Sequence, residues 1–203
     1  MIHHALEYLR VYLSRFVIIP SNDGGDTSRV QLANVATIND PEGEADDVLL
    51  ISLVNLEEEF TRKNLPPLRR EDGSGRINYR NPPVFLNLYA LFCAKIDNYF
   101  TALRVLSEVI ACIQAQHVFE IGNSGLDLNE SDAAFSIQEE LRFRIELELY
   151  SMTFEQLNHL WGTLGGKQYP SVMYKIRLVQ LEKEVLHGRG QVIRHINLNS
   201  SAQ

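Results

Sequence analysis

Hydrophobic and polar residues follow two periods along the chain, one typical of helices and one typical of strands. Apolar residues recur every three or four positions over 2–16, after Asn98 and over 154–163, so three amphipathic helices are expected. Asn98 and Thr153 are residue types that cap a helix N-terminus, and the double glycine at 165–166 can end the last helix.

Five further segments show the pattern of strands. Residues 141–149 alternate between apolar and polar without a fault, which predicts one face on the core and one in water. Residues 48–56 are almost continuously apolar, as in a central strand buried on both faces. The other strands are expected at 30–36, 84–92 and 172–181. The pattern predicts an α+β fold, with one mostly antiparallel sheet of four to five strands packed with helices.

Two long stretches separate these elements and lack a sustained period. They are residues 57–83 and residues 117–136, and we expect both to be connections without regular structure. No internal repeat divides the chain. We therefore expect a single domain over 1–184 and a C-terminal extension over 185–203 that is partly disordered.

Composition narrows the classes of function that this fold can serve. Of the 203 residues 45% are hydrophobic and 22% charged, as in an average globular protein. A net charge of −7, from 19 Lys and Arg against 26 Asp and Glu, disfavours nucleic acid and anionic membranes as partners. No apolar run approaches the roughly 20 residues that cross a bilayer. We expect synthesis in the cytoplasm, no membrane insertion, and buried free thiols at Cys93 and Cys112.

The string 162–167, with three glycines before a lysine, suggests a phosphate-binding loop, but its spacing does not fit. A P-loop needs Gly six positions before the lysine and Ser or Thr directly after it, and these positions hold Trp161 and Gln168. A predicted helix also precedes the glycines instead of following them. The end of a helix is the simpler interpretation.

No other motif predicts an active site. The six histidines show neither an HExxH pattern nor a C-x-x-C companion, and Ser124 and Ser171 lack a nucleophile elbow. We therefore expect no catalytic, cofactor-binding or metal-binding residues, and we interpret Trp161 as a core or interface anchor. An enzyme that uses loop residues such as Asp127, Asp132 and His117 remains an alternative, which a pocket with convergent polar groups would favour.

Residues 152–177, MTFEQLNHLWGTLGGKQYPSVMYKIR, resemble the signature of the tail-terminator, or cap, proteins of phage-tail-like contractile injection systems. Residues 51–59 (ISLVNLEEE) and 81–89 (NPPVFLNLY) resemble two further blocks of that family, in the same order. With the opening helix, the resemblance runs from residue 2 to about residue 181.

This resemblance implies a non-enzymatic subunit that ends the tube and sheath of an extracellular or type VI-like contractile particle. It implies a homo-hexameric ring with the sheath protein and the inner tube protein as partners, assembled in the cytoplasm as part of a particle that can be released. A ring needs heterologous contacts that close by rotation, and a free sheet edge can receive an extended segment from a sheath subunit. The candidate interface or structural signature residues are Asn158, His159, Trp161, Gly165, Gly166, Lys167, Asn81, Pro82 and Pro83. A monomeric assembly adaptor or chaperone of the same particle is the alternative function, and oligomeric state separates the two.

Overall fold

The computed structural model describes residues 2–20, 26–27, 29–37, 47–59, 68–72, 76–80, 84–121, 143–181 and 188–191. Its elements follow one another in the order α1 (Ile2–Ser14), β1 (Ile19–Pro20), β2 (Asp26–Thr27), β3 (Val30–Leu32), η1 (Val35–Thr37), β4 (Val48–Glu58), β5 (Leu68–Asp72), β6 (Arg76–Arg80), β7 (Val84–Lys95), α2 (Tyr99–Ala115), β8 (Val118–Ile121), β9 (Phe143–Tyr150), α3 (Phe154–Thr163), β10 (Ser171–Leu181) and β11 (Gly188–Gln191).

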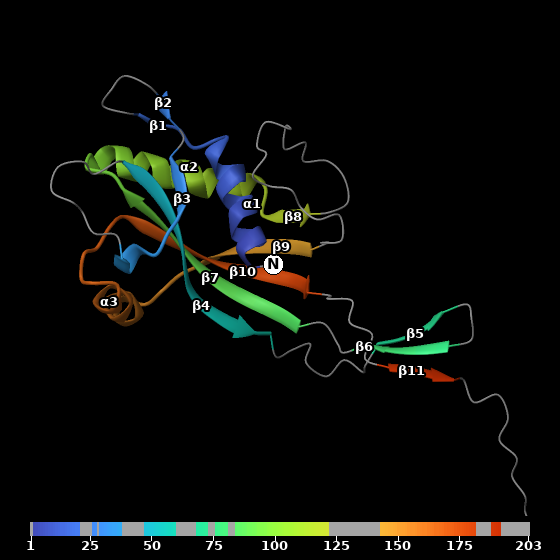
Figure 1. The fold of residues 1–203 in the computed structure, drawn as a ribbon. Coiled ribbons are helices and arrows are strands. Elements are labelled where there is room, and N and C mark those ends of the chain that lie inside the picture. The colour runs from blue at the N-terminus through green and yellow to red at the C-terminus, as the bar shows by residue number, and fades with distance from the viewer. Residues whose placement is uncertain are drawn as a thin grey trace, which may run out of the picture.

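A six-stranded sheet in the order β3-β4-β7-β10-β9-β8 forms the centre of the molecule (Figure 1). Only the short β3–β4 pair is parallel, and the other four pairs are antiparallel. The long strands β4, β7 and β10 lie side by side, so that Phe92 of β7 pairs with Ile51 of β4 and Val172 of β10. The predicted α+β class with a mostly antiparallel sheet is confirmed, although the sheet has six strands instead of four to five.

Helices α1 and α2 cover one face of this sheet (Figure 1). The amphipathic stripe of α1 buries Leu9 and Leu13 completely, and α2 contributes Val105 and Val109 to the same cluster. The predicted cap of α2 is confirmed, because the Asn98 side chain accepts a hydrogen bond from the backbone N–H of Thr101 at 3.2 Å. This larger core contains the strand side chains that point toward α1 and α2.

The predicted alternation of β9 is confirmed except at its end, where Leu149 of the apolar face is 57% exposed. Ile145 and Leu147 are buried under the helices, whereas Arg144 and Glu148 on the opposite face pair with charged residues of neighbouring strands. The Arg177 Nη2 atom of β10 lies 3.0 Å from the Glu148 carboxylate. One face of β9 therefore meets the core and the other meets water, as the sequence predicted.

Helix α3 packs on the opposite face of the sheet and forms a second, smaller core with η1 (Figure 1). Trp161 is its largest buried side chain, and it shares this cluster with Leu50, Leu91, Cys93 and Met173 of the central strands. The molecule thus has three layers, with two helices on one face of the sheet and one on the other.

The predictions for two of the strands are corrected. The strand expected at 30–36 ends at Leu32, because Asn34 accepts hydrogen bonds from Ala36 and Thr37 and starts a 3-10 turn. The strand expected to be central and buried on both faces, β4, is second in the order, and its burial stops after Ser52. The first half of β4 therefore packs into both cores, and its second half lies at an exposed surface.

The two stretches expected to lack regular structure contain strands. Within 57–83, β5 and β6 form a hairpin that continues into β11 from near the C-terminus, as a separate three-stranded sheet (Figure 1). Within 117–136, β8 pairs with β9. These short strands are specified by backbone pairing, between neighbours for β5 and β6 and with more distant segments for β8 and β11, and their few residues carry no periodic signal.

Both cysteines are free, as predicted, but only one is buried. Cys93 is fully buried, and this burial raises the pKa of its thiol to about 12. Cys112 is half-buried at the margin of the larger core, and burial together with the negative charge of nearby Glu108 raises the pKa of its thiol. Among the helices of the described residues, none is long and apolar enough to span a membrane.

Candidate functional site

Helix α3 is held at both ends by local hydrogen bonds, and it brings most of the predicted signature residues together. Thr153 and Gln156 form a reciprocal capping box, in which the Thr153 hydroxyl accepts from the Gln156 N–H and the Gln156 side chain accepts from the Thr153 N–H. This cap fixes where the helix starts, and so which face of it meets the sheet.

Trp161 anchors α3 to the sheet. Its side chain is 5% exposed, and its ring meets Tyr169 edge-on at a centroid distance of 6.3 Å. The indole Nε1 atom has no hydrogen-bond partner within the described part of the chain. A buried indole without a partner for its N–H contributes apolar packing, so Trp161 acts here as a packing anchor.

The double glycine ends α3 as the sequence predicted. Gly165 and Gly166 have φ values of +97° and +77°, and the Gly166 N–H donates to the Trp161 carbonyl at 2.8 Å. The left-handed backbone turns the chain from α3 toward Tyr169 and the start of β10.

Replacing Gly165 or Gly166 by alanine is expected to lower the free energy of unfolding by about 1 kcal/mol each. A Cβ at either position meets no atom within 4 Å, so the cost comes from the positive φ and not from a clash. Gly162→Ala is the matched control, because Gly162 lies inside α3 with equally open surroundings and without a positive φ. Alanine there is expected to be neutral or slightly stabilising. Equal losses for all three variants in urea unfolding would contradict this assignment.

The other predicted signature residues lie at the surface. Asn158, His159 and Lys167 are exposed, and the His159 Nε2 atom lies 3.8 Å from the Glu155 carboxylate one turn away. Asn81, Pro82 and Pro83 lie outside the described residues. The structure therefore groups the 158–167 residues around one helix and its C-terminus, and the role of these positions in an interface stays a prediction.

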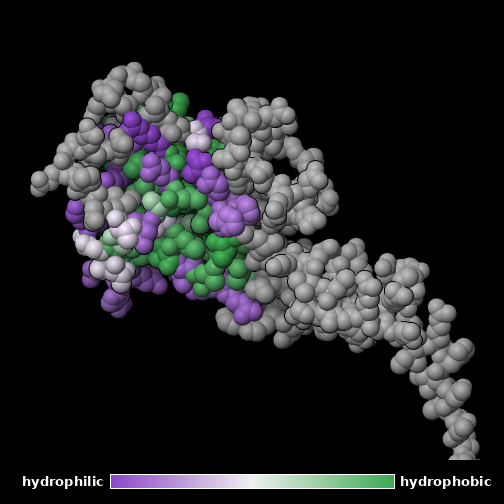
Figure 2. Space-filling view, viewed as in Figure 1, coloured by the Kyte–Doolittle hydropathy of each residue, from purple (hydrophilic) through white to green (hydrophobic). Residues whose placement is uncertain are grey.

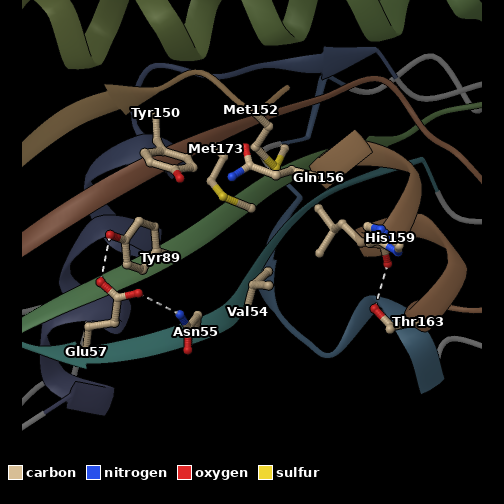
Figure 3. Close-up of a pocket in the computed structure, with 11 residues that line it drawn as sticks. Val54, Asn55, Glu57, Tyr89, Tyr150, Met152, Gln156, His159, Thr163 and Met173 are labelled. Atoms are coloured by element: carbon tan, nitrogen blue, oxygen red, sulfur yellow. Dashed lines mark hydrogen bonds between the residues drawn. The ribbon is translucent and has the colours of Figure 1, made fainter. Parts of the chain in front are cut away.

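An open groove of about 370 Å³ lies between α3 and the sheet (Figure 3). Its apolar lining combines side chains from the second half of β4, from β7, from β10, from the segment between β9 and α3, and from α3 itself. The residues that line the groove are Val54, Asn55, Glu57, Tyr89, Tyr150, Met152, Gln156, His159, Leu160, Thr163 and Met173. Two methionines and two tyrosine rings make this an adaptable surface for an apolar side chain.

The polar end of the groove is organised by Glu57. Its Oε2 atom accepts a hydrogen bond from the Tyr89 hydroxyl at 2.9 Å, and its Oε1 atom accepts from Asn55 Nδ2 at 3.2 Å (Figure 3). Burial, the hydrogen bond to Glu57 and the negative charge of Glu57 raise the pKa of Tyr89 to about 12. The arrangement can orient a ligand by hydrogen bonding and negative charge.

The raised pKa of Tyr89 predicts a loss of stability at alkaline pH. The folded state holds the phenol proton more tightly than the unfolded state, so this stabilisation is present below pH 10 and is lost as the pH rises toward about 12. Tyr89→Phe is expected to reduce the steepness of this loss, as measured by urea unfolding across that range. Tyr99→Phe, at an exposed ring of α2, is the control. An unchanged pH dependence in Tyr89→Phe would contradict the role of the Glu57 hydrogen bond.

The groove offers little for catalysis. Its lining contains one carboxylate, Glu57, and one imidazole, His159, and they come from separate elements. Within the described ranges no group of three His, Cys, Asp or Glu side chains could hold a metal ion. Of the alternative enzyme residues, His117 lies between α2 and β8, where its carbonyl accepts from the Leu147 N–H, and Asp127 and Asp132 lie outside the described residues.

Sequence reasoning missed most of the groove. Tyr89, Tyr150 and Met173 sit in predicted strands as ordinary strand residues, and only the pairing of β7, β9 and β10 brings them together. The block 51–59 did contain Val54, Asn55 and Glu57, but its resemblance to a family block gave them no role. A break in the apolar run of β4 at Asn55 was the one local signal of an exposed polar position.

Comparisons with known proteins agree with this fold. A family model described as the Pvc16 N-terminal domain matches residues 4–195. The chain is similar to a PVC sheath/tube terminator of an extracellular contractile injection system in its extended state, with a TM-score of 0.57 and 15% identity over 100% of this chain and 65% of that chain. It is also similar to the tube-terminating cap of the anti-feeding prophage, with a TM-score of 0.54 and 15% identity over 97% of this chain and 58% of that chain. The chain thus spans less than two thirds of the length of both proteins. A search of curated protein sequences finds no match.

Proposed function

This chain belongs to the family of the Pvc16 N-terminal domain, and from that premise we propose that it is a terminator subunit of a contractile injection particle. In this role it ends the inner tube and the sheath and carries out no chemical reaction. The observation that carries the proposal is the combination of a family match over 4–195 with a fold that follows two terminator proteins along nearly the whole chain. The predicted tail-terminator family is thereby confirmed.

We propose that the subunit works as a ring of six copies that contacts the sheath protein and the inner tube protein. A closed ring needs two different complementary surfaces on each copy. Helix α2 offers one candidate surface, because Tyr99, Phe100, Leu103 and Ile110 are exposed although they are large and apolar. The sheet edge at β4 and the groove beside α3 are instead candidate surfaces for the sheath or the inner tube protein.

A non-enzymatic role fits the chemistry of the groove. Its lining holds one carboxylate and one imidazole, without a paired nucleophile and base. Assembly in the cytoplasm, followed by incorporation into a particle that can leave the cell, is the location that we propose for the subunit. Binding to other proteins is the function that this surface supports best.

The test is the mass and placement of the chain, alone and with the sheath and inner tube proteins of the same particle. Light scattering should give about six times the 23.2 kDa of one chain, and negative-stain images should show added density at one end of assembled tubes. A chain that stays monomeric and binds neither protein at high concentration would overturn the proposal. A monomer that binds either protein but is missing from finished particles would favour the assembly adaptor instead.

A further inference from the structure

Among the described residues, the outer edge of β4 has a partner strand over only the first half of its length. Strand β3 pairs with β4 only from Leu49 to Ile51, and the last bond between them runs from the Ala33 N–H to the Ile51 carbonyl at 3.2 Å. Beyond Ile51, β7 is the only strand of the described chain that pairs with β4. The segment Ser52–Glu57, about 17–20 Å long, is therefore an open edge.

Leu53 and Leu56 turn their backbone polar groups toward this open edge. The Leu49 N–H donates to the Arg29 carbonyl on the β3 side, so Leu53, four residues on, faces the same way. After the bulge between Leu53 and Asn55, the Glu59 N–H donates to the Phe85 carbonyl of β7, which leaves Leu56 directed outward.

Asn55 occupies the place of a strand partner at this edge. Its Oδ1 atom accepts a hydrogen bond from the Leu56 N–H at 2.8 Å, the bond that the carbonyl of an added strand would make. The other end of the same amide donates to Glu57. An exposed side chain that satisfies an edge donor can be displaced by an incoming backbone at little cost, because it then returns to water.

An added strand would find apolar surface on both faces. On the face with α1 and α2, Leu53 and Leu56 are 39% and 43% exposed, and hydrophobic side chains gather in Figure 2 over the region where the central strands lie uncovered. On the other face, Val54 lines the groove together with Met173 and Leu160. Successive side chains of an added strand point to these two faces in turn.

Charge at the edge indicates which segment fits. Glu57 is the one acidic side chain that lines the groove, and the lining contains no Lys or Arg. Antiparallel pairing of this edge with the same edge of a second copy would place Ser52, and not a basic residue, opposite Glu57. A segment with apolar residues opposite Leu53, Val54 and Leu56 and a basic residue opposite Glu57 fits both requirements.

We propose that the edge Ser52–Glu57 binds an extended segment of a partner protein, which joins the six-stranded sheet as a further strand and carries apolar residues followed by a basic residue. Backbone hydrogen bonds to Leu53 and Leu56 provide affinity, and the groove beside α3 selects one side chain. The inference rests on the proposed function in one respect, because the partner is taken to be a protein of the same particle.

Leu56→Pro tests the edge selectively. Proline removes the outward N–H of Leu56 and blocks an added strand, but it removes no bond to β7. Leu56→Thr is the matched control, since threonine keeps the N–H and favours a strand. Circular dichroism and thermal unfolding establish that both full-length variants fold.

The first arm measures binding of a labelled octapeptide, Lys-Thr-Val-Leu-Val-Lys-Thr-Lys, by fluorescence anisotropy. Leu56→Pro should weaken binding by about tenfold or more, roughly the 1.4 kcal/mol of one or two edge hydrogen bonds, and Leu56→Thr should bind nearly as well as the wild type. Glutamate in place of the lysines, or N-methylation of the central residues, should abolish binding of the peptide. Equal binding by wild type and Leu56→Pro, or no binding by the wild type, overturns the proposal.

The second arm counts capped ends of tubes assembled with the wild type and the two variants. Capping by the wild type and by Leu56→Thr, but not by Leu56→Pro, supports the edge site. Capping by all three overturns the site and leaves the terminator role intact. If none of them caps tubes while the peptide still distinguishes the variants, the terminator role fails and the edge site stands. If the wild type forms a dimer and Leu56→Pro abolishes it, the edge binds a second copy of this chain. That result overturns the proposal that the edge binds a different protein.

Discussion

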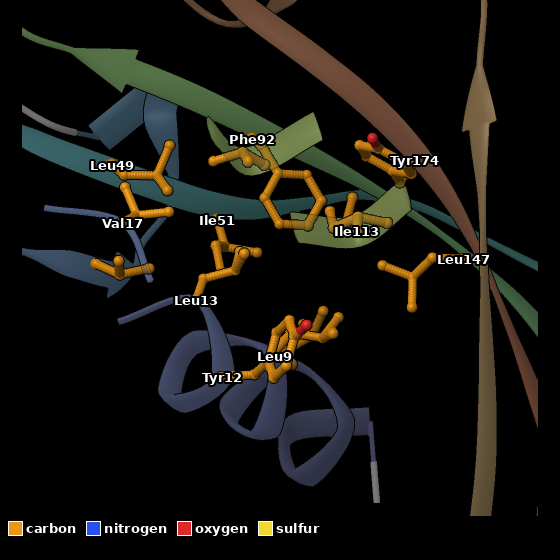
Figure 4. Close-up of a cluster of buried hydrophobic side chains, with 14 of the residues drawn as sticks. Leu9, Tyr12, Leu13, Val17, Leu49, Ile51, Phe92, Ile113, Leu147 and Tyr174 are labelled. Atoms are coloured by element: carbon orange, nitrogen blue, oxygen red, sulfur yellow. The ribbon is translucent and has the colours of Figure 1, made fainter. Parts of the chain in front are cut away.

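Phe92→Ala is expected to lower the free energy of unfolding by about 3–5 kcal/mol, enough to unfold much of the protein if its stability is ordinary. The Phe92 side chain is fully buried in the middle of β7, and its ring meets that of Tyr174 edge-on at 5.5 Å (Figure 4). It lies in the core that joins the sheet to α1 and α2, so its removal leaves a cavity that no single neighbour can fill.

Urea unfolding followed by circular dichroism measures this loss. Phe154→Ala is the control, because the Phe154 ring is 91% exposed at the start of α3 and its removal should change stability by less than about 0.5 kcal/mol. A loss below about 1 kcal/mol for Phe92→Ala would mean that the larger core is not organised around β7.

Trp161→Ala is expected to cost about 3–5 kcal/mol and to release α3 from the sheet. Trp161 is the only buried residue of α3, and the rest of the smaller core comes from strands and η1. Without it the helix keeps its caps but loses its anchor, and the groove loses the wall that contains Leu160 and Thr163. Binding at the groove should therefore fall together with stability.

Trp161→Phe separates the packing of Trp161 from its hydrogen-bonding capacity. Phenylalanine keeps an aromatic ring and lacks the N–H that has no partner among the described residues, so the cost should stay below about 2 kcal/mol. Because Trp161 is the only tryptophan, unfolding of both variants is followed by circular dichroism and not by fluorescence. A cost for Trp161→Phe as large as that for Trp161→Ala would indicate a polar role for the indole.

Predictions from sequence succeeded where one element carries its own pattern. The helices at 2–16 and 154–163, the caps at Asn98 and Thr153, and the alternation of β9 all depend on interactions within a few residues along the chain. They failed for β5, β6, β8 and the end of β3, because these short segments carry no sustained alternation and are held by strand pairing. This pairing is local between β5 and β6 and involves more distant segments for β8 and β11.

In the candidate site, too, only the features with a local sequence pattern could be predicted. The Trp161 anchor and the glycines that end α3 could be named from the sequence, since a helix end has a local signature. The groove could not, because Tyr89, Tyr150 and Met173 meet only after β7 and β9 have both paired with β10. The open edge of β4 was equally hidden, because it exists only where β3 stops short of its neighbour.

The helices, the long strands, the α+β class and the family can be predicted from local sequence, since each of these follows from periodicity, capping or a contiguous block of residues. The strand order, the division into two cores and the place where β3 stops pairing with β4 are found only in the folded chain. Strand order depends on contacts between residues far apart in the chain, and such contacts leave no periodic trace in any one segment. For this protein, the surface proposed to bind a partner is therefore a product of topology, whereas the elements that carry it are a product of local sequence.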